Sequence, residues 1–190
     1  MSHQPRGPLG PDDERAQRLL ARIRDVPDFP KPGVVFKDIS PLLADHTTFT
    51  EVVDALAAPF AEAGIHTVAG IEARGFVLGA PVALELGAGF VPVRKQGKLP
   101  GTTVSASYEL EYGSAVLEVT SDAFITGARV LIVDDVLATG GTAAATVDLV
   151  RRCGGEVVGV AMLMELGFLD GRAALAAAGV DDDLHVLLTV

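Results

Sequence analysis

One segment, Arg129–Thr142, constrains the fold more than any other part of the chain. It reads RVLIVDDVLATGGT, so four apolar residues starting at Val130 are followed by two aspartates and a glycine-rich turn. The apolar run predicts a buried strand, and the turn predicts the start of a helix. Open α/β sheets are built from such strand–turn–helix units, and they bind ligands beyond the carboxyl ends of their strands.

The rest of the chain repeats this alternation. Further apolar strands are predicted at residues 67–71, 89–93, 157–163 and 184–189, and helices at 75–86, 142–153 and 171–178. Apolar strands that alternate with helices indicate an α/β fold, a mostly parallel twisted sheet flanked by helices. A hairpin formed by residues 108–110 and 115–119 is predicted as a flexible insertion, preceded by a long mobile loop, residues 94–107.

The N-terminal part is predicted to stand apart from the sheet. Residues 1–11 contain three prolines and two glycines and are expected to form a disordered tail, with residues 12–190 as a single domain. Within that domain, residues 12–45 are expected to form a helix and a small hood. The spacing Thr48-x-x-Glu51 predicts a capping box that opens the next helix.

Composition excludes several classes of protein. The formal charge of −10 argues against a general nucleic-acid or membrane-surface binder, and no segment has the length of a membrane span. The single cysteine, Cys153, cannot form an internal disulfide, and no Cys/His cluster has zinc-ligand spacing. We therefore expect a cytoplasmic protein without nucleic-acid or membrane partners.

The turn after the acids predicts a phosphate site. A glycine-rich turn that enters a helix offers free backbone N–H groups and the positive end of the helix dipole. The turn lacks the lysine of a Walker A motif. The carboxylates of Asp134 and Asp135 would repel a phosphate unless another group separated the acids from it. A sugar with free hydroxyls can be that group. The segment therefore predicts a ribose 5-phosphate, with the acids at the 2- and 3-hydroxyls and Mg²⁺ offsetting charge.

This segment resembles the phosphoribosyl-diphosphate motif of type I phosphoribosyltransferases. Four more blocks are similar, in order, to those of the adenine-specific members: Val34–Leu42 (VVFKDISPL), Gly70–Phe76 (GIEARGF), Arg94–Gly101 (RKQGKLPG) and Tyr108–Gly113 (YELEYG). The resemblance covers about 150 residues. It implies the type I fold, a homodimer, Mg²⁺ brought by the substrate with no direct protein ligand assigned, and formation of AMP and diphosphate from adenine and phosphoribosyl diphosphate.

The resemblance also implies residue roles. Glu111 would transfer the proton at adenine, and Tyr112 would belong to a lid. Asp134 and Asp135 would stabilise positive charge at the ribose C1, and Arg74 would stabilise the charge on the leaving diphosphate. The resemblance also implies which residues bind each part of the substrates. The phosphoribosyl group would be bound by Asp134, Asp135, Ala138, Thr139, Gly140, Gly141 and Thr142, and the diphosphate by Arg74, Arg94, Lys95 and Lys98. Adenine would be bound by Val35, Phe36, Lys37 and Leu163.

Several of these assignments have plain alternatives. Glu109 competes with Glu111 from the same strand face, and either could be a solvent-facing acid. Arg94 could be a solvated charge, and Leu163 could belong to the core. Lys37 stands where the family often has arginine, which matters only if the contact there is through the side chain.

Two other functions remain to be distinguished. The same fold could use another purine base, such as hypoxanthine or guanine, although the blocks at 94–101 and 108–113 argue against this. A regulator that binds phosphoribosyl diphosphate without catalysis would need a DNA-binding module. Only about 30 partly proline-rich residues precede the core, and no helix-turn-helix fits them.

Overall fold

The central element of the fold is a seven-stranded sheet with the order β5-β6-β4-β3-β7-β8-β9. The computed structural model describes residues 13–109 and 114–190. The five strands β3, β4, β7, β8 and β9 are parallel, and β6 and β5 extend the sheet antiparallel at one edge. This confirms the predicted mostly parallel α/β sheet. The parallel strands are β3 (Thr67–Ile71), β4 (Gly89–Lys95), β7 (Arg129–Leu137), β8 (Glu156–Glu165) and β9 (Leu184–Thr189).

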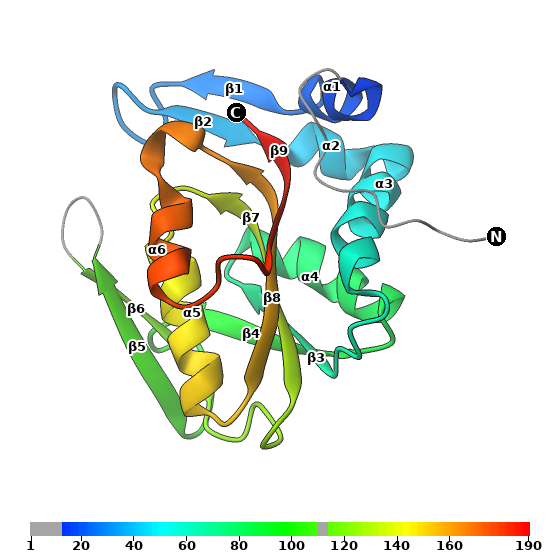
Figure 1. Cartoon of the computed structure of the whole chain (residues 1–190). Helices are drawn as coiled ribbons and strands as arrows, with labels where there is room; N and C mark the ends of the chain where they lie inside the picture. Colours follow the sequence, from blue (N-terminus) through cyan, green and yellow to red (C-terminus); the bar gives the residue numbers. More distant parts are fainter. Residues whose placement is uncertain (1–12, 110–113) are drawn as a thin grey trace.

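Helices cover both faces of this sheet, as Figure 1 shows. On one face, α3 and α4 pack against β3, β7, β8 and β9, and on the other, α5 contacts β5 to β8 with α6 beside it. Two clusters of buried apolar side chains fill the layers, one on each face. The helices are α3 (His46–Ala57), α4 (Arg74–Glu85), α5 (Gly141–Arg152) and α6 (Gly171–Ala177), with short 3₁₀ turns η1 (Ala58–Phe60) and η2 (Gly167–Leu169).

The prediction that residues 94–107 form a long mobile loop is wrong. Strand β5 (Thr103–Glu109) occupies its second half and pairs along its whole length with β6 (Ser114–Thr120). Val104, Ala106 and Tyr108 alternate along β5 and pack against the core cluster on that face. This period-two pattern was present in the sequence, but the intervening serines and threonines made it resemble a loop. Only residues 96–102 lie between β4 and β5.

The N-terminal segment forms the predicted hood. Helix α1 (Glu14–Leu20) leads to an antiparallel pair, β1 (Arg24–Pro27) and β2 (Val35–Asp38), and then to α2 (Ser40–Ala44). In Figure 1 the β1–β2 pair lies over the end of the sheet where β9 finishes. The hood therefore overhangs the carboxyl ends of the parallel strands.

The start of the next helix differs from the prediction. Helix α3 begins at His46, because the Asp45 side chain accepts a hydrogen bond from the Thr48 N–H and caps it. The Thr48 hydroxyl instead donates to the Leu42 carbonyl, which ties α2 to α3. The helix ends before Pro59, which lies in η1, as a proline inside the sequence pattern predicts.

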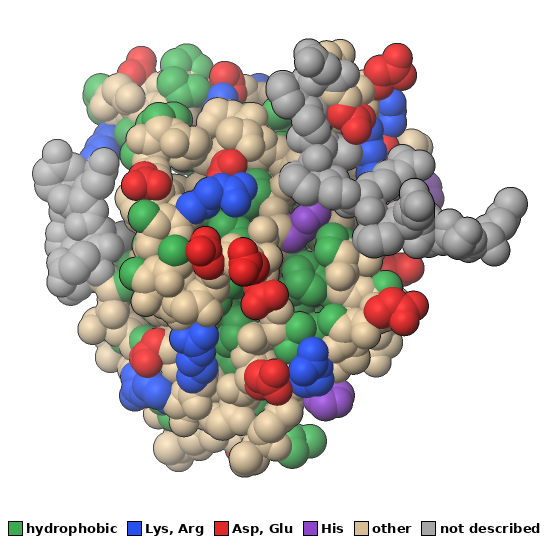
Figure 2. Space-filling view, viewed as in Figure 1, with side chains coloured by type: hydrophobic (Ala, Val, Ile, Leu, Met, Phe, Trp, Pro, Cys, Tyr) green, Lys and Arg blue, Asp and Glu red, His purple; other side chains and the backbone are tan. Residues whose placement is uncertain are grey.

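The surface mixes both signs of charge. On the face in Figure 2, lysine and arginine side chains stand singly or in small groups with acidic side chains close by. No helix within residues 13–109 and 114–190 is long and apolar enough to cross a bilayer.

Candidate active site

The order of the strands creates a crevice between β3 and β7. The chain passes from β3 to β4 on one side, and later returns to place β7 on the other side of β3. Parallel pairing sets Gly70 opposite Val133, so Arg74 after β3 and the acids Asp134 and Asp135 in β7 reach the same edge. Ligands of open α/β sheets bind at such a switch point. The structure thus brings together residues that the sequence separates by 60 positions.

Arg74 makes the central contacts of this crevice. It is the first residue of α4, and its Nε lies 2.8 Å from Asp135 Oδ2. Its Nη1 donates a hydrogen bond of 3.2 Å to the Lys37 carbonyl, and its guanidinium carbon lies 4.7 Å from the centre of the Phe36 ring. One cation therefore joins the acids of the sheet to the hood.

The two aspartates lie inside β7 rather than beyond its end, because this strand runs on to Leu137. Asp135 is buried and Asp134 half-buried. The glycine at position 75 lets α4 approach, since a Cβ there would lie 2.8 Å from Asp134 Oδ1. The Asp135 N–H donates to this same oxygen over 2.9 Å.

The surroundings of the two aspartates disfavour their charged forms. Burial, and next the negative charge of Asp135, raise the pKa of the Asp134 carboxyl well above its usual range. Burial also raises the pKa of Asp135, although the Arg74 charge opposes this. Asp135 Oδ2 is close enough to Arg74 for an ion pair, but it is buried and accepts no hydrogen bond from any described residue. Buried polar atoms are nearly always hydrogen-bonded, so this oxygen fits a ligand hydroxyl or a metal-bound water.

A metal would find few protein ligands here. Among the residues the structure describes, no group of three or more His, Cys, Asp or Glu side chains could hold an ion. Mg²⁺ commonly uses one or two carboxylates together with substrate oxygens and water. The two aspartates fit that mode, and an ion brought with a diphosphate suits them better than a resident one.

The predicted phosphate turn has the expected form. Gly140 has φ +80° and precedes α5, which begins at Gly141. A Cβ at position 140 would overlap the Gly171 carbonyl oxygen and lie 2.8 Å from the Ala174 Cβ. Only glycine fits this backbone and this space.

A hollow open to solvent lies in front of the turn. It has a volume of about 50 Å³, and its lining includes Asp134, Ala138, Thr139, Gly140 and Thr142. Within the described part of the chain, the N–H groups of residues 141–143 make no hydrogen bond, as is usual for the first turn of a helix. The hollow therefore combines free amides, hydroxyls and an acid at one place.

The basic residues of the Arg94 block divide into two kinds. The Arg94 Nε lies 3.2 Å from Glu72 Oε2, and its Nη1 donates to the Lys98 carbonyl. Lys95 and Lys98 are exposed and form no ion pair with any residue the structure describes. Lys95 and Lys98 are therefore better placed for direct contact with an anion, and the predicted role of Arg94 in binding diphosphate stays a prediction.

The Glu72 carboxylate is a site residue that the sequence reasoning missed. It follows β3 directly, two positions before Arg74, and accepts hydrogen bonds from the Arg94 Nε and the Lys95 N–H. Burial acts to raise the pKa of Glu72, but these hydrogen bonds outweigh it and the pKa lies below its ordinary value. An acid at the carboxyl end of a strand was the signal that could have identified it.

The hood supplies the predicted adenine residues. Val35 is 52% exposed, and Phe36 lies beneath Arg74 with Phe29 edge-on at 5.2 Å. The Lys37 ammonium pairs with Asp25 at 2.8 Å, while the Lys37 carbonyl faces Arg74. At this position the main chain therefore faces Arg74, while the lysine side chain turns away to Asp25.

Leu163 does not line an accessible surface. It is fully buried in the core cluster beside α3 and α4, so the predicted adenine contact would need this side chain to become accessible, and it stays a prediction. The burial follows from its place in β8, which is covered on both faces. Glu111 and Tyr112 lie outside the described residues.

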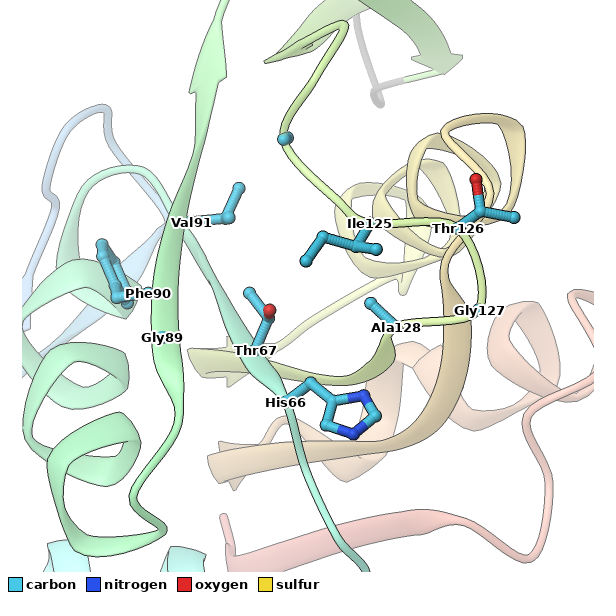
Figure 3. A pocket seen from close by; sticks show the side chains of 10 residues that line it. His66, Thr67, Gly89, Phe90, Val91, Ile125, Thr126, Gly127 and Ala128 are labelled. Atoms are coloured by element: carbon cyan, nitrogen blue, oxygen red, sulfur yellow. The ribbon is translucent and has the colours of Figure 1, made fainter.

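A larger hollow lies at the opposite, amino edge of the sheet (Figure 3). It lies between the starts of β3 and β4 and the loop before β7, and Thr67, Val91 and Ile125 line it. None of the described residues that line it is Asp, Glu, Lys or Arg. A phosphorylated sugar needs charged and hydrogen-bonding groups, so this hollow does not compete with the crevice at Arg74.

Comparison with known proteins agrees with this geometry. The family model "Phosphoribosyl transferase domain" matches residues 43–177. An adenine phosphoribosyltransferase of Streptomyces coelicolor is 62% identical over 172 residues, which cover 90% of this chain and 94% of the relative.

Solved structures show the same likeness. The adenine phosphoribosyltransferase of Rhodothermus marinus superposes with a TM-score of 0.88 at 52% identity, covering 93% of this chain and 98% of that one. The Saccharomyces cerevisiae enzyme, complexed with an imino-altritol bisphosphate and adenine, gives 0.82 at 40% identity, covering 92% and 97%. The chain therefore belongs to the phosphoribosyltransferase family, among the adenine phosphoribosyltransferases.

Proposed function

We propose that the chain transfers the 5-phosphoribosyl group from phosphoribosyl diphosphate to adenine, forming AMP and diphosphate in purine salvage. The observation that carries this is the position of Arg74. It lies between the acids of β7 and the carbonyl and ring of the hood, so it touches both predicted substrate subsites at once. The 62% identity to an adenine phosphoribosyltransferase supports the same base.

The phosphoribosyl group is held by the segment from Asp134 to Thr142. The amides and hydroxyls of residues 138–142 bind the 5-phosphate at the start of α5, where the helix dipole also favours an anion. Asp134 and Asp135 accept hydrogen bonds from the 2- and 3-hydroxyls of the ribose. These bonds would satisfy the buried Asp135 oxygen.

The diphosphate binds the cations around the crevice. Arg74 contacts it from α4, and Lys95 and Lys98 contact it from the end of β4, with Arg94 beside them. These charges stabilise the negative charge that develops on the leaving group. Mg²⁺, brought with the diphosphate, would neutralise part of that charge when bound.

In the reaction, the bond between the ribose C1 and the diphosphate oxygen breaks, and a bond from C1 to the adenine N9 forms. Positive charge spreads over C1 and the ring oxygen, and Asp134 and Asp135 stabilise it without forming a covalent bond. Glu111 accepts the N9 proton, and Tyr112 helps to exclude water from the closed site. Both of these residues lie outside the described part of the chain.

Adenine lies under the hood. Val35 and Phe36 cover its faces, and main-chain groups near Lys37 bind its edges. Leu163, which is buried in β8, would reach adenine only if its side chain became accessible. We further propose that residues 12–190 act as one domain, that two copies form a homodimer, and that the enzyme works in the cytoplasm without nucleic-acid or membrane partners.

One assay tests this function. The purified chain is incubated with phosphoribosyl diphosphate, Mg²⁺ and, in turn, adenine, hypoxanthine and guanine, and the nucleotide is detected by chromatography. We expect AMP from adenine and no comparable product from the other bases. Product from another base would change the substrate, and binding of phosphoribosyl diphosphate without any product would indicate a regulator.

A further inference from the structure

A buried acid outside the family motifs lies next to the predicted diphosphate subsite. Glu118, in β6, is only 6% exposed. Its Oε2 accepts a hydrogen bond of 3.0 Å from the Gly97 N–H, and its Oε1 accepts one of 3.3 Å from the Ser105 hydroxyl. Burying a charge is costly unless donors satisfy it, and here one donor, Gly97, lies in the β4–β5 connection and the other, Ser105, in β5. The acid therefore ties that connection to the sheet.

Glu118 acts on a short segment that we call the basic turn, residues Lys95–Lys98. The turn needs φ +75° at Gly97, and a hydrogen bond from the Gln96 N–H to the Val116 carbonyl, 3.1 Å, also ties it to β6. The basic turn is thus bound to β6 at two successive amides, one through a main-chain carbonyl and one through a carboxylate.

A second acid holds the other side of the basic turn. Glu72 accepts the Lys95 N–H over 3.0 Å and the Arg94 Nε over 3.2 Å, and the Arg94 Nη1 in turn donates to the Lys98 carbonyl over 3.1 Å. All four residues of the turn therefore have a fixed backbone group. The two lysine side chains remain exposed, without an ion pair to any residue within 13–109 and 114–190.

We propose that Glu118 is a positioning residue for the diphosphate, acting through the Gly97 N–H to fix the direction of the Lys95 and Lys98 side chains. This inference rests on the proposed function. The acid cannot touch the substrate from its buried position, and its own negative charge would repel an anion. Its contribution is that the turn is already in place when the diphosphate arrives. Cations that are already held in place lose less conformational entropy on binding an anion than cations on a free loop.

The test replaces Glu118 by methionine, an apolar side chain of similar length that removes the acceptor but keeps the volume. We expect the KM for phosphoribosyl diphosphate to rise about tenfold, because the hydrogen bonds from Gly97 and Ser105 to a charged acceptor are both lost. The KM for adenine should change by less than about twofold. Glu118→Gln should restore the wild-type value, because its amide oxygen accepts from Gly97 and its NH₂ donates to the Ser105 hydroxyl.

Two further variants and one physical measurement complete the test. Ser105→Ala removes only the second donor and should raise the same KM by about threefold. Glu156→Gln is the matched control, because Glu156 is an exposed acid at the start of β8, paired with Arg129. It should change neither KM. Hydrogen exchange of the Gly97 amide should be slow in the wild type and fast in Glu118→Met.

The outcomes separate this inference from the function itself. A wild-type chain that forms no AMP overturns the proposed function. An active wild type in which Glu118→Met folds but leaves the KM for phosphoribosyl diphosphate unchanged, or raises both KM values equally, overturns the positioning role. If Glu118→Met does not fold, an unchanged KM in Ser105→Ala or a rapidly exchanging Gly97 amide in the wild type is decisive against it.

Discussion

Replacing Gly140 by alanine tests the physical basis of the phosphate turn. Gly140 has φ +80°, a conformation that costs an L-residue about 1–2 kcal/mol. In addition, the new Cβ would overlap the Gly171 carbonyl and lie 2.8 Å from Ala174 Cβ. Overpacking of this kind costs about 1–3 kcal/mol more. The variant should therefore be destabilised by two separate effects.

The matched control is Gly127→Ala. Gly127 has φ +77°, and nothing lies within 4 Å of its ideal Cβ position. Gly127 precedes β7 at the edge of the sheet far from the crevice. Alanine at this position would therefore have only the free-energy cost of the positive φ, without an overlap. Since a chain of this size loses about 2–4 °C of Tm per kcal/mol, we expect a loss of about 2–8 °C for Gly127→Ala and about 2–12 °C more for Gly140→Ala.

Differential scanning calorimetry measures both variants, and steady-state kinetics follows. Gly140→Ala should also raise the KM for phosphoribosyl diphosphate, because relief of the overlap moves the turn away from α6. Gly127→Ala should leave that KM unchanged. Equal Tm losses in the two variants, or a normal KM in Gly140→Ala, would refute the close approach of this turn to Gly171 or its role in binding.

Three further changes have expected outcomes. Glu111→Gln should slow turnover by about 10²–10⁴-fold while phosphoribosyl diphosphate still binds, as measured by kinetics and calorimetry, and unchanged turnover would remove the acid–base role. Asp134→Asn should abolish most activity yet raise the Tm at pH 7. Burial raises the pKa of Asp134 in the folded state, so the wild type loses stability as the pH rises above the ordinary aspartate pKa. The Tm difference between the variant and the wild type should therefore vanish in acid. Arg74→Lys should raise the KM for both substrates about tenfold or more, since a point charge cannot contact Asp135, the Lys37 carbonyl and the Phe36 ring together; a change in only one KM would contradict that bridging role.

The sequence predicted the parallel sheet and the phosphate turn because both are local patterns. The apolar run from Val130 and the glycines at 140 and 141 specify a strand and a turn whatever surrounds them. The ends of elements were harder, since β7 runs on through Asp134 and Asp135, where pairing with β8 outweighs the polar side chains.

The wrong prediction for β5 and the missed residue Glu72 have one physical cause: both depend on contacts between segments that are far apart in the sequence. Residues 103–107 of β5 resemble a loop because serine and threonine interrupt the apolar pattern, and pairing with β6 decides their structure; the hairpin predicted from residue 108 on belongs to the same strand pair. The role of Glu72 depends on β4 lying beside β3, because its hydrogen-bond donors belong to Arg94 and Lys95 of β4. No single segment contains that information.

The contacts of Arg74 likewise could not be read from the chain. Its motif predicted a cation at the end of β3. The hydrogen bond to the Lys37 carbonyl arises because the hood overhangs the carboxyl edge of the sheet, as Figure 1 shows. The Lys37 side chain itself turns away from the crevice to Asp25.

The most direct measurement is a crystal structure of the chain with bound AMP. The account predicts the 5-phosphate against the free amides at the start of α5, both ribose hydroxyls on Asp134 and Asp135, and the adenine ring under the hood beside Phe36. A nucleotide bound in the hollow at the amino edge, with residues 138–142 empty, would contradict it.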